Sequence, residues 1–486
     1  MTFFINFLIV LCLAAVAFQA FVGVAFFLSS IYEKERRAAV VGFFQCAVMV
    51  GVLVLFVIWA MTGFFHTVLG RGLLILFLAA SGAAVFYLTR RTEKNQRALQ
   101  GSSGLIVGYV KRFDERMHVF ARNRSLRPES PEYSAFYREH PELEDYDRQR
   151  RERGGPVGKV GSIDQPKGGV PAAMALASQK MCEYLSIPEI YRPQPHIAFR
   201  EKVAQQKTEL SPQEAAERVK GYARHLGAAL VGVTEINPLW LYAQRGEIFH
   251  ENWDDWGRDI TLDTQYAVVM AEEMSLEMIG AAPHTPTVVE SMQVYAKGAY
   301  IATQVAAFIA NLGYQATANH LRHYDAILPA LAVDAGLGEL GRLGYLISRE
   351  LGPRIRLSAV LTDLPLTTDR PVDIGVMDFC RACKKCAACC PSQSIPREDD
   401  PSEHNGLLRW KLNAETCFDY WGKIGTDCNV CMKVCPWSHA RTFPHQLIVW
   451  LVSRNKHARK IFLAMDDVFY GKKPKPKPAP RWADTH

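Results

Sequence analysis

Three long apolar runs fill most of the first ninety residues of this 486-residue chain. Residues 2–32 and 38–65 contain no charged side chain, and residues 72–89 form a third, shorter run. At about 1.5 Å per residue, each run can cross or nearly cross a hydrocarbon core of about 30 Å. The pattern predicts three membrane-spanning helices. A cleavable signal is disfavoured, because the first run is too long, lacks a preceding basic region, and is followed by two more.

The basic residues beside these runs predict an orientation. Lys34, Arg36 and Arg37 occupy the first loop, whereas the second loop holds only Arg71, and four further basic residues at positions 90, 91, 94 and 97 follow the third run. Cytoplasmic loops are enriched in Lys and Arg. We therefore expect a multi-pass protein of the inner cell membrane with its C-terminal part in the cytoplasm, a compartment that also suits reduced thiols.

Helical and strand patterns alternate after about residue 172. Residues 211–226 predict an amphipathic helix with Ser211 as its N-cap and Glu214 completing a capping box. Residues 228–233, 266–271 and 358–362 are short apolar runs that predict strands, and residues 294–312 predict a long helix ended by Gly313. The alternation favours an α/β or α+β domain whose sheet is covered on both faces. In contrast, the polar run that begins at Tyr146 predicts a solvated coil linker.

Charge and cysteine content exclude some classes of function. The net charge is +7, and no stripe of basic and aromatic residues is present, so nucleic acid is not an expected partner. The chain has 12 cysteines without a cleavable signal, which does not indicate a disulfide framework. Cys12 and Cys46 lie in apolar runs and are expected to be inert thiols, while Cys182 and Cys389 have no assigned role.

The spacing of the other eight cysteines is the most informative chemical signal. It reads C-x-x-C-x-x-C-x-x-x-C-P from Cys380, and later C-x-x-C-x-x-x-C-P from Cys428 with Cys417 before it. In ferredoxins with this spacing, three close thiolates and one distant thiolate hold each cluster. Two [4Fe-4S] clusters are therefore predicted, one on Cys380, Cys383, Cys386 and Cys435, the other on Cys390, Cys417, Cys428 and Cys431. Two structural zinc sites are the alternative, although zinc ribbons usually show paired C-x-x-C knuckles.

A glycine pattern at Gly336, Gly338 and Gly341 matches a dinucleotide-binding fingerprint in its spacing. It is not convincingly placed between a strand and a helix, so a backbone that approaches a large flat ligand is the favoured interpretation.

The chain resembles the reductive dehalogenases, which are corrinoid and iron-sulfur enzymes, over roughly residues 110–471. The resemblance lies in the ordered set KRFDERMHVF, VYAKGAYIATQVAAFIANLGY, LAVDAGLGELGRLG, GPRIRLSAVLTDLPL, the double cysteine run and MDDVFYG. It implies a nitroreductase-like core that binds base-off cobalamin, with Gly336, Gly338, Gly341 and Tyr295 near the cofactor, and a ferredoxin-like insertion. It also implies removal of halogen from an organohalide with electrons delivered through the clusters.

The same resemblance assigns the proton donor to Tyr295 and its basic partner to Arg356, with Tyr300 as an alternative donor. A nearby guanidinium favours the phenolate and so makes the proton of a tyrosine easier to give. The segment around Asn319, Leu321 and His323 departs from the family pattern, which leaves the substrate open. His320 and His323 are read as polar pocket or surface residues.

These interpretations divide the chain into a membrane anchor (residues 1–90), a polar linker (91–171), a corrinoid-binding core (172–370), a double-cluster domain (371–445) and a C-terminal segment (446–486). The expected partners are an organohalide, the lipid bilayer, and an electron donor such as a ferredoxin, a flavoprotein or a quinol-linked protein. Two alternatives stay open: an enzyme similar to epoxyqueuosine reductase, and a membrane electron-transfer protein without catalysis. Cobalt content would distinguish the carrier from the enzymes.

Overall fold

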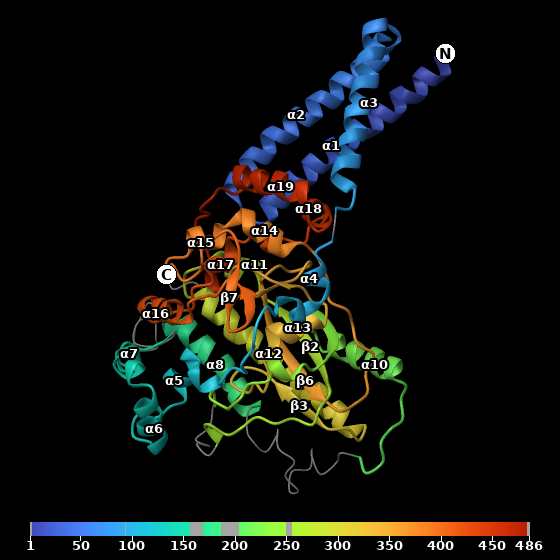
Figure 1. The fold of residues 1–486 in the computed structure, drawn as a ribbon. Coiled ribbons are helices and arrows are strands. Elements are labelled where there is room, and N and C mark those ends of the chain that lie inside the picture. The colour runs from blue at the N-terminus through green and yellow to red at the C-terminus, as the bar shows by residue number, and fades with distance from the viewer. Residues whose placement is uncertain (1, 93, 156–168, 186–203, 249–254, 484–486) are drawn as a thin grey trace. The chain divides into compact units, whose positions relative to one another are not determined.

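The computed structural model describes residues 2–92, 94–155, 169–185, 204–248 and 255–483 (Figure 1). By packing, the chain forms two units. One consists of Met1–Lys94 and His439–Lys475, and the other of Asn95–Ser438 and Pro476–His486. The first unit therefore combines the N-terminal residues with a segment close to the C-terminus, whereas the five-segment division made from sequence stays a prediction.

The first unit contains the three predicted apolar helices. They are α1 (Thr2–Tyr32), α2 (Arg36–Met61) and α3 (Val68–Thr89), and all three are long and apolar enough to cross a membrane. Their outward side chains are apolar and exposed; Phe44, for example, is 65% exposed. The sequence prediction of three such helices is confirmed.

Two C-terminal helices, α18 (Phe443–Val452) and α19 (Lys456–Phe469), complete this unit. They pack on each other and on the ends of α1 and α2 that face the α1–α2 turn (Figure 1). Phe26 of α1 lies 4.6 Å from Phe469 between ring centroids, in an edge arrangement. Residues more than 400 positions apart thus share one small core.

The second unit is built around a four-stranded antiparallel sheet with the order β1-β2-β6-β3. The strands are β1 (Leu230–Glu235), β2 (Tyr266–Glu273), β3 (Ala316–Asn319) and β6 (Ile355–Thr362). Each predicted strand is present, with its ends moved by a few residues. Two further pairs are short: β4 (Glu339–Leu340) with β5 (Leu346–Ile347), and β7 (Ser402–His404) with β8 (Leu407–Arg409).

Alternate residues of the central strands feed two separate cores, because neighbouring side chains of a strand point to opposite faces. Val268 and Met270 of β2 pack with α10 (Pro212–His225) and α12 (Pro286–Asn311). Val269, on the opposite face of β2, packs with α13 (Leu328–Asp334). Both faces are covered, as the sequence pattern predicts.

Local signals at two helix ends behave as expected. Ser211 and Glu214 form the capping box that begins α10. Gly313 follows the last turn of α12 with a φ of 91°, a left-handed conformation that glycine adopts without strain. The beginning of α12 was not predicted correctly: the helix starts at Pro286, eight residues before the expected Val294, because Pro286 fits a first helical turn.

The remaining helices of the second unit are mostly short. They are α4 (Gln96–Leu99), α5 (Val119–Arg124), α6 (Pro131–Glu139), α7 (Pro141–Arg153), α8 (Gly169–Leu185), α11 (Leu276–Gly280), α14 (Val376–Cys383), α15 (Lys385–Cys389), α16 (Ala414–Ile424) and α17 (Val430–Lys433).

The prediction of a solvated coil from Tyr146 is wrong over the part that the structure describes; residues 156–168 of that run lie outside it. Residues up to Arg153 belong to α7. Asp147 on this helix is fully buried and binds the guanidinium of Arg122 at 2.7 Å and that of Arg150 at 2.8 Å. Asp147 and Arg150 are the two buried residues of this charged helix, and their ion pairs attach it to the rest of the unit. Sequence periodicity does not detect such a helix, because it has almost no apolar face.

Candidate active site and metal centres

Four predicted cluster ligands meet where α14 and α15 adjoin the segment after α17. Burial raises the pKa of the Cys386 thiol, and the neighbouring thiols of Cys380, Cys435 and Cys383 raise it further. Three of these side chains reach this point from two consecutive short helices, while Cys435 comes from almost fifty residues later. This is the first set expected from the cysteine spacing.

The other four predicted ligands line one pocket. Cys390, Cys417, Cys428 and Cys431 all contribute to its wall, together with Tyr345. Burial raises the pKa of Cys417 to about 12, with Cys428 and Cys390 adding to the rise. This is the second expected set. Eight thiols in two groups of four fit two cubane clusters, and four thiolates can also hold zinc.

Backbone conformation and hydrogen bonds help to orient the cysteine side chains of both sets. Lys384 and Asn429, each directly after a cysteine, adopt positive φ values of 52° and 47°. In this left-handed conformation the chain turns sharply enough to return the next cysteine to the same point. The backbone N–H of Ser394 donates to the sulfur of Cys390 at 3.3 Å, and donors of this kind tune the reduction potential of a bound cluster.

The cysteines without an assigned role are placed differently. Cys12 is buried in the apolar core around α1. Cys182 on α8 is fully buried and packs beside Tyr295. Burial raises the pKa of its thiol to about 12, so it is neutral at physiological pH. Cys389 is partly buried in α15, next to the ligand Cys390.

The structure brings Tyr295 and Arg356 together, as the resemblance implies. The guanidinium carbon of Arg356 lies 5.1 Å from the ring centroid of Tyr295. Tyr295 is on α12 and Arg356 is on β6, on the strand face that also presents Ser358 and Val360 to α12. Because side chains of a strand alternate between its two faces, Arg356 points toward α12, and the close packing of α12 on β6 brings it to Tyr295.

A polar network holds the guanidinium of Arg356 in place. One of its terminal nitrogens donates to Ser291 Oγ at 2.9 Å and lies 3.8 Å from Asp427 Oδ2. Asp427 accepts further hydrogen bonds from Ser291, from Thr287 at 2.8 Å and from Asn429 at 2.8 Å. Because Asp427 and Asn429 flank Cys428, the network connects the candidate catalytic pair to the second set of thiols.

The charge on Arg356 is stabilised although the side chain is only 10% exposed. Burial opposes the charge, but Tyr295, Asp427 and Tyr345 outweigh burial and raise the pKa of the guanidinium. Its Nε is buried without a hydrogen-bond partner among the described residues. A buried donor of this kind is available to a bound group.

Other polar side chains share this region. Burial raises the pKa of Tyr324 and of Tyr345 well above the ordinary value, and both rings interact electrostatically with Tyr295. Burial lowers the pKa of Arg124, and Glu247 and Tyr295 partly counteract this effect. Three tyrosines and two arginines therefore form one partly desolvated polar site.

Of the remaining predicted positions, Leu321 belongs to the small apolar cluster that packs against Tyr295, whereas the others are not among the described members of that cluster. Tyr300, the alternative donor, is 49% exposed on α12, whereas Arg356 stands over the ring of Tyr295. Asn319 and His320 are buried, and the backbones of His320 and His323 bond each other across a tight turn. The reading of the histidines as polar pocket or surface residues stays a prediction.

The three glycines of the fingerprint pack against their own chain. A side chain on Gly336 would meet Arg370 O at 2.4 Å, one on Gly338 would meet Ile347 O at 2.2 Å, and one on Gly341 would meet the Ile347 side chain at 2.4 Å. They surround the β4–β5 hairpin, and no helix of useful length follows them. Contact of these glycines with a cofactor stays a prediction.

Sequence reasoning missed Ser291, Asp427, Asn429 and Tyr345. Ser291 precedes Tyr295 by four residues, a spacing that places both on one helix face. Asp427 and Asn429 flank a ligand cysteine, which was a second available signal. Tyr345 follows the glycine pattern without any local mark of its role.

Known proteins resemble the chain over much of its length. It is 32% identical over 292 residues to the tetrachloroethene reductive dehalogenase of Sulfurospirillum multivorans. The aligned residues are 54% of this chain and 58% of the relative. It matches the solved catabolic reductive dehalogenase NpRdhA with a TM-score of 0.59 and 26% identity, over 79% of the chain and 49% of that protein. A solved reductive dehalogenase described as B12-dependent matches with a TM-score of 0.59 and 25% identity, over the same shares of the two chains.

The chain is thus similar to reductive dehalogenases in both sequence and fold. It spans about half the length of the relatives that it matches. No protein-family model matches it. Similarity to an epoxyqueuosine reductase from Leadbetterella byssophila, at 35% identity, extends over only 119 residues, or 24% of the chain. The similarity to reductive dehalogenases therefore extends over a larger part of the chain than the similarity to epoxyqueuosine reductase.

Proposed function

We propose that this chain is a membrane-anchored, corrinoid-dependent reductive dehalogenase that replaces halogen on an organohalide with hydrogen. The observation that carries the proposal is the pair Tyr295 and Arg356, in which the guanidinium carbon lies 5.1 Å from the centroid of the tyrosine ring. Through Ser291, this pair is connected to Asn429, which follows the cluster ligand Cys428. A proton source and an electron-transfer centre are the two components that reductive removal of halide requires.

Two [4Fe-4S] clusters and a base-off cobalamin are the proposed cofactors. Cys380, Cys383, Cys386 and Cys435 would hold one cluster, and Cys390, Cys417, Cys428 and Cys431 the other. The corrinoid would lie near Tyr295 and the Gly336–Gly341 hairpin, where the buried Nε of Arg356 is available to a bound group. When bound, it supplies the low-potential cobalt chemistry that breaks a carbon–halogen bond.

The chain's own residues provide the proton and its control. Tyr295 gives its phenolic proton to carbon, and the positive charge of Arg356 stabilises the phenolate that remains. Ser291 and Asp427 position the guanidinium through the contacts at 2.9 and 3.8 Å. The Arg356 side chain is only 10% exposed, and the low local dielectric strengthens its interactions with Tyr295 and Asp427.

In finer detail, we assign the four-stranded sheet and its covering helices to a nitroreductase-like core. The cysteine-rich segment after β6 would then be a ferredoxin-like insertion that brings electrons to it. The order of elements along the chain supports this division, because every cluster ligand follows β6.

We infer that α1, α2 and α3 anchor the protein in the inner cell membrane with the site in the cytoplasm. Their length and apolar composition support the anchor, and the basic residues of the first loop and after α3 support the orientation. The electron donor would be a ferredoxin, a flavoprotein or a quinol-linked protein. Reporter fusions at the C-terminus and near Arg71 should lie on opposite sides, and an exported C-terminus would contradict the orientation.

Metal analysis of anaerobically purified full-length protein tests the cofactor assignment. We expect about eight irons and one cobalt per chain. Cys386→Ser should lower iron to about four or fewer, whereas Cys46→Ser, a cysteine of α2 outside both sets, should leave it unchanged. Zinc in place of iron, or iron without cobalt, would contradict the dehalogenase. The second of these results would support a plain electron carrier, and retained cobalt with activity only on an RNA substrate would support a relative of epoxyqueuosine reductase.

A further inference from the structure

The first unit contains a further group of side chains that could bind a metal ion, and this group includes none of the cysteines assigned to iron. Glu33 follows α1 in the turn before α2, His439 precedes α18, and His445 lies in the first turn of α18. The Glu33 side chain is 1% exposed and that of His445 is 7% exposed. A carboxylate buried so deeply requires strong partners.

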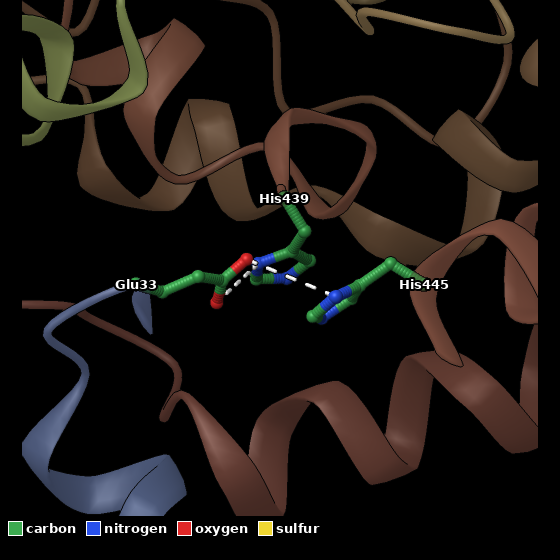
Figure 2. Close-up of side chains that lie close together, drawn as sticks. All are labelled: Glu33, His439 and His445. Atoms are coloured by element: carbon green, nitrogen blue, oxygen red, sulfur yellow. Dashed lines mark ion pairs between the residues drawn. The ribbon is translucent and has the colours of Figure 1, made fainter. Parts of the chain in front are cut away.

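The three side chains point toward one another (Figure 2). Glu33 Oε2 lies 3.7 Å from His439 Nδ1, and Glu33 Oε1 lies 3.8 Å from His445 Nδ1. One ligand atom from each residue lies within 4.8 Å of the other two. The two imidazoles are stacked, with centroids 4.9 Å apart and planes at 23°.

The other ring nitrogen of each histidine, Nε2, makes a hydrogen bond to a residue of the C-terminal segment. His439 Nε2 bonds Asp466 Oδ1 at 2.8 Å, and His445 Nε2 bonds the hydroxyl of Tyr470 at 2.9 Å. Asp466 lies on α19, and Tyr470 follows its last turn. Histidines that bind metals commonly donate their outer N–H to a carboxylate or another oxygen, which fixes the ring and directs the inner nitrogen at the ion.

We propose that Glu33, His439 and His445 form a binding site for one divalent transition-metal ion, with Zn²⁺ as the best fit. Two imidazole nitrogens and one carboxylate oxygen are a common donor set for this ion. With bonds of about 2.0–2.1 Å in tetrahedral geometry, neighbouring ligand atoms are about 3.3 Å apart. The separations of 3.7 and 3.8 Å involve the two different carboxylate oxygens of Glu33 and exceed this value by about half an ångström. As a set, the ligand atoms lie within 4.8 Å of one another, so the three side chains must draw together around the ion, and water would complete the coordination.

The ion would fasten the α1–α2 turn to the C-terminal helices α18 and α19. This role is independent of the clusters and of dehalogenation. A hydrogen-bonded network without metal is the competing explanation. Ala440 N–H already donates to Glu33 Oε1 at 2.6 Å, and the Tyr470 hydroxyl donates to Oε2 at 3.0 Å. His445 Nδ1, a proposed ligand atom, also lies at hydrogen-bond distance from the hydroxyls of Thr442 (2.8 Å) and Ser29 (3.2 Å), which the ion would displace. Both explanations keep the residues together, so only metal binding separates them.

Zinc loading of the full-length protein in detergent tests the site. The protein is equilibrated with Zn²⁺, passed over a desalting column, and analysed for zinc and iron per chain. Zn²⁺ binds nitrogen and oxygen sites more tightly than Fe²⁺, Mn²⁺ or Co²⁺, so it also detects a site that holds one of these in the cell. We expect one zinc with nitrogen and oxygen neighbours at about 2.0–2.1 Å by X-ray absorption, whereas cysteine ligands would give sulfur at about 2.3 Å.

Glu33→Gln and His445→Ala should each lose this zinc and keep the iron content of the parent. His457→Ala is the matched control: His457 is in α19 of the same unit, and its ring contacts that of Tyr87 in a tilted arrangement, with centroids 4.9 Å apart, and is not part of the metal-ligating group. Glu33→Gln keeps the size of the side chain, so it remains informative if His445→Ala fails to fold. Absence of zinc with nitrogen and oxygen ligands in the parent protein, or its retention in Glu33→Gln, would overturn the proposal and leave a hydrogen-bonded network.

Discussion

Two buried arginines of the second unit, Arg122 and Arg356, show how a structural charge differs from one available for chemistry. Every nitrogen of the Arg122 guanidinium has a partner: Nε bonds Asp147 at 2.7 Å, Nη1 bonds Met117 O at 2.6 Å, and Nη2 bonds Glu415 at 2.8 Å. Arg356 has a buried Nε without a partner in the described parts of the chain and stands over a tyrosine ring.

The difference follows from what each group is required to do. A fully paired buried charge has its desolvation cost offset and stabilises one arrangement of the chain. A partly paired charge retains interaction capacity for a ligand or for a charge that develops during reaction. Both arginines are buried, so burial does not distinguish them. They differ in how many of their guanidinium N–H groups have a hydrogen-bond partner.

The largest expected effect comes from the ring under Arg356. Tyr295→Phe removes only the phenolic hydroxyl, so the fold and cofactor content should be retained. Loss of a general acid typically lowers the rate by about 10²–10⁴-fold, and we expect a loss of dehalogenation in this range. Tyr300→Phe, on the exposed face of the same helix, is the control and should be close to the parent. Near-normal turnover in Tyr295→Phe with full cobalt and iron would show that the proton comes from elsewhere.

Arg356→Leu should impair the same step, because the phenolate of Tyr295 would lose its positive partner. We expect turnover to fall by about 10²-fold or more. In the double variant with Tyr295→Phe, the losses should not multiply, since both residues serve one proton transfer. Rates measured for the parent, both single variants and the double variant form the test. Independent, multiplying losses would separate Arg356 from the proton donor.

Arg122→Met should act on stability and leave chemistry intact. Removing one partner of a buried ion pair typically costs about 3–5 kcal/mol. We expect a comparable decrease in the free energy of unfolding in urea, with unchanged turnover per folded, cobalt-loaded molecule. Arg148→Met is the control: its side chain is 59% exposed in a pair with Asp145, and the change should be within about 0.5 kcal/mol. A specific loss of turnover in Arg122→Met would remove the contrast with Arg356.

The smallest effect is a pH dependence at Glu272, whose buried Oε2 has no hydrogen-bond partner among the residues that the structure describes. Burial raises the pKa of this carboxyl to about 8, while Ser358 and Lys297 oppose the rise. The folded state thus holds the proton more tightly than the unfolded state. This contribution to stability is fully present below about pH 4.5 and is lost as pH rises toward 8, by up to about 1.4 kcal/mol per pH unit.

Glu272→Gln keeps the shape of the protonated form and cannot ionise. Its melting temperature relative to the parent should therefore increase between pH 6 and pH 8, where the parent loses this contribution. A flat difference for Glu272→Gln would show that Glu272 is ionised in the folded protein throughout.

The sequence by itself determined the features that depend on local spacing. Three apolar runs, the capping box at Ser211 and the helix end at Gly313 each follow from residues a few positions apart, and the structure contains all of them. The cysteine spacing likewise predicts two sets of four thiols, and the chain brings both sets together. Tyr295 and Arg356 were identified from the order of family motifs, because neither residue is unusual within its own segment.

Only the tertiary structure decided which charges are paired and with what. The helix α7 was predicted to be coil, because its two buried charged residues are paired with Arg122 and Glu415, which are far away in sequence. The support of Arg356 by Asp427 and the meeting of Glu33 with His439 and His445 join residues from about seventy to more than four hundred positions apart. Periodicity reports which face of an element is apolar, whereas the partner of a buried charge depends on packing between elements.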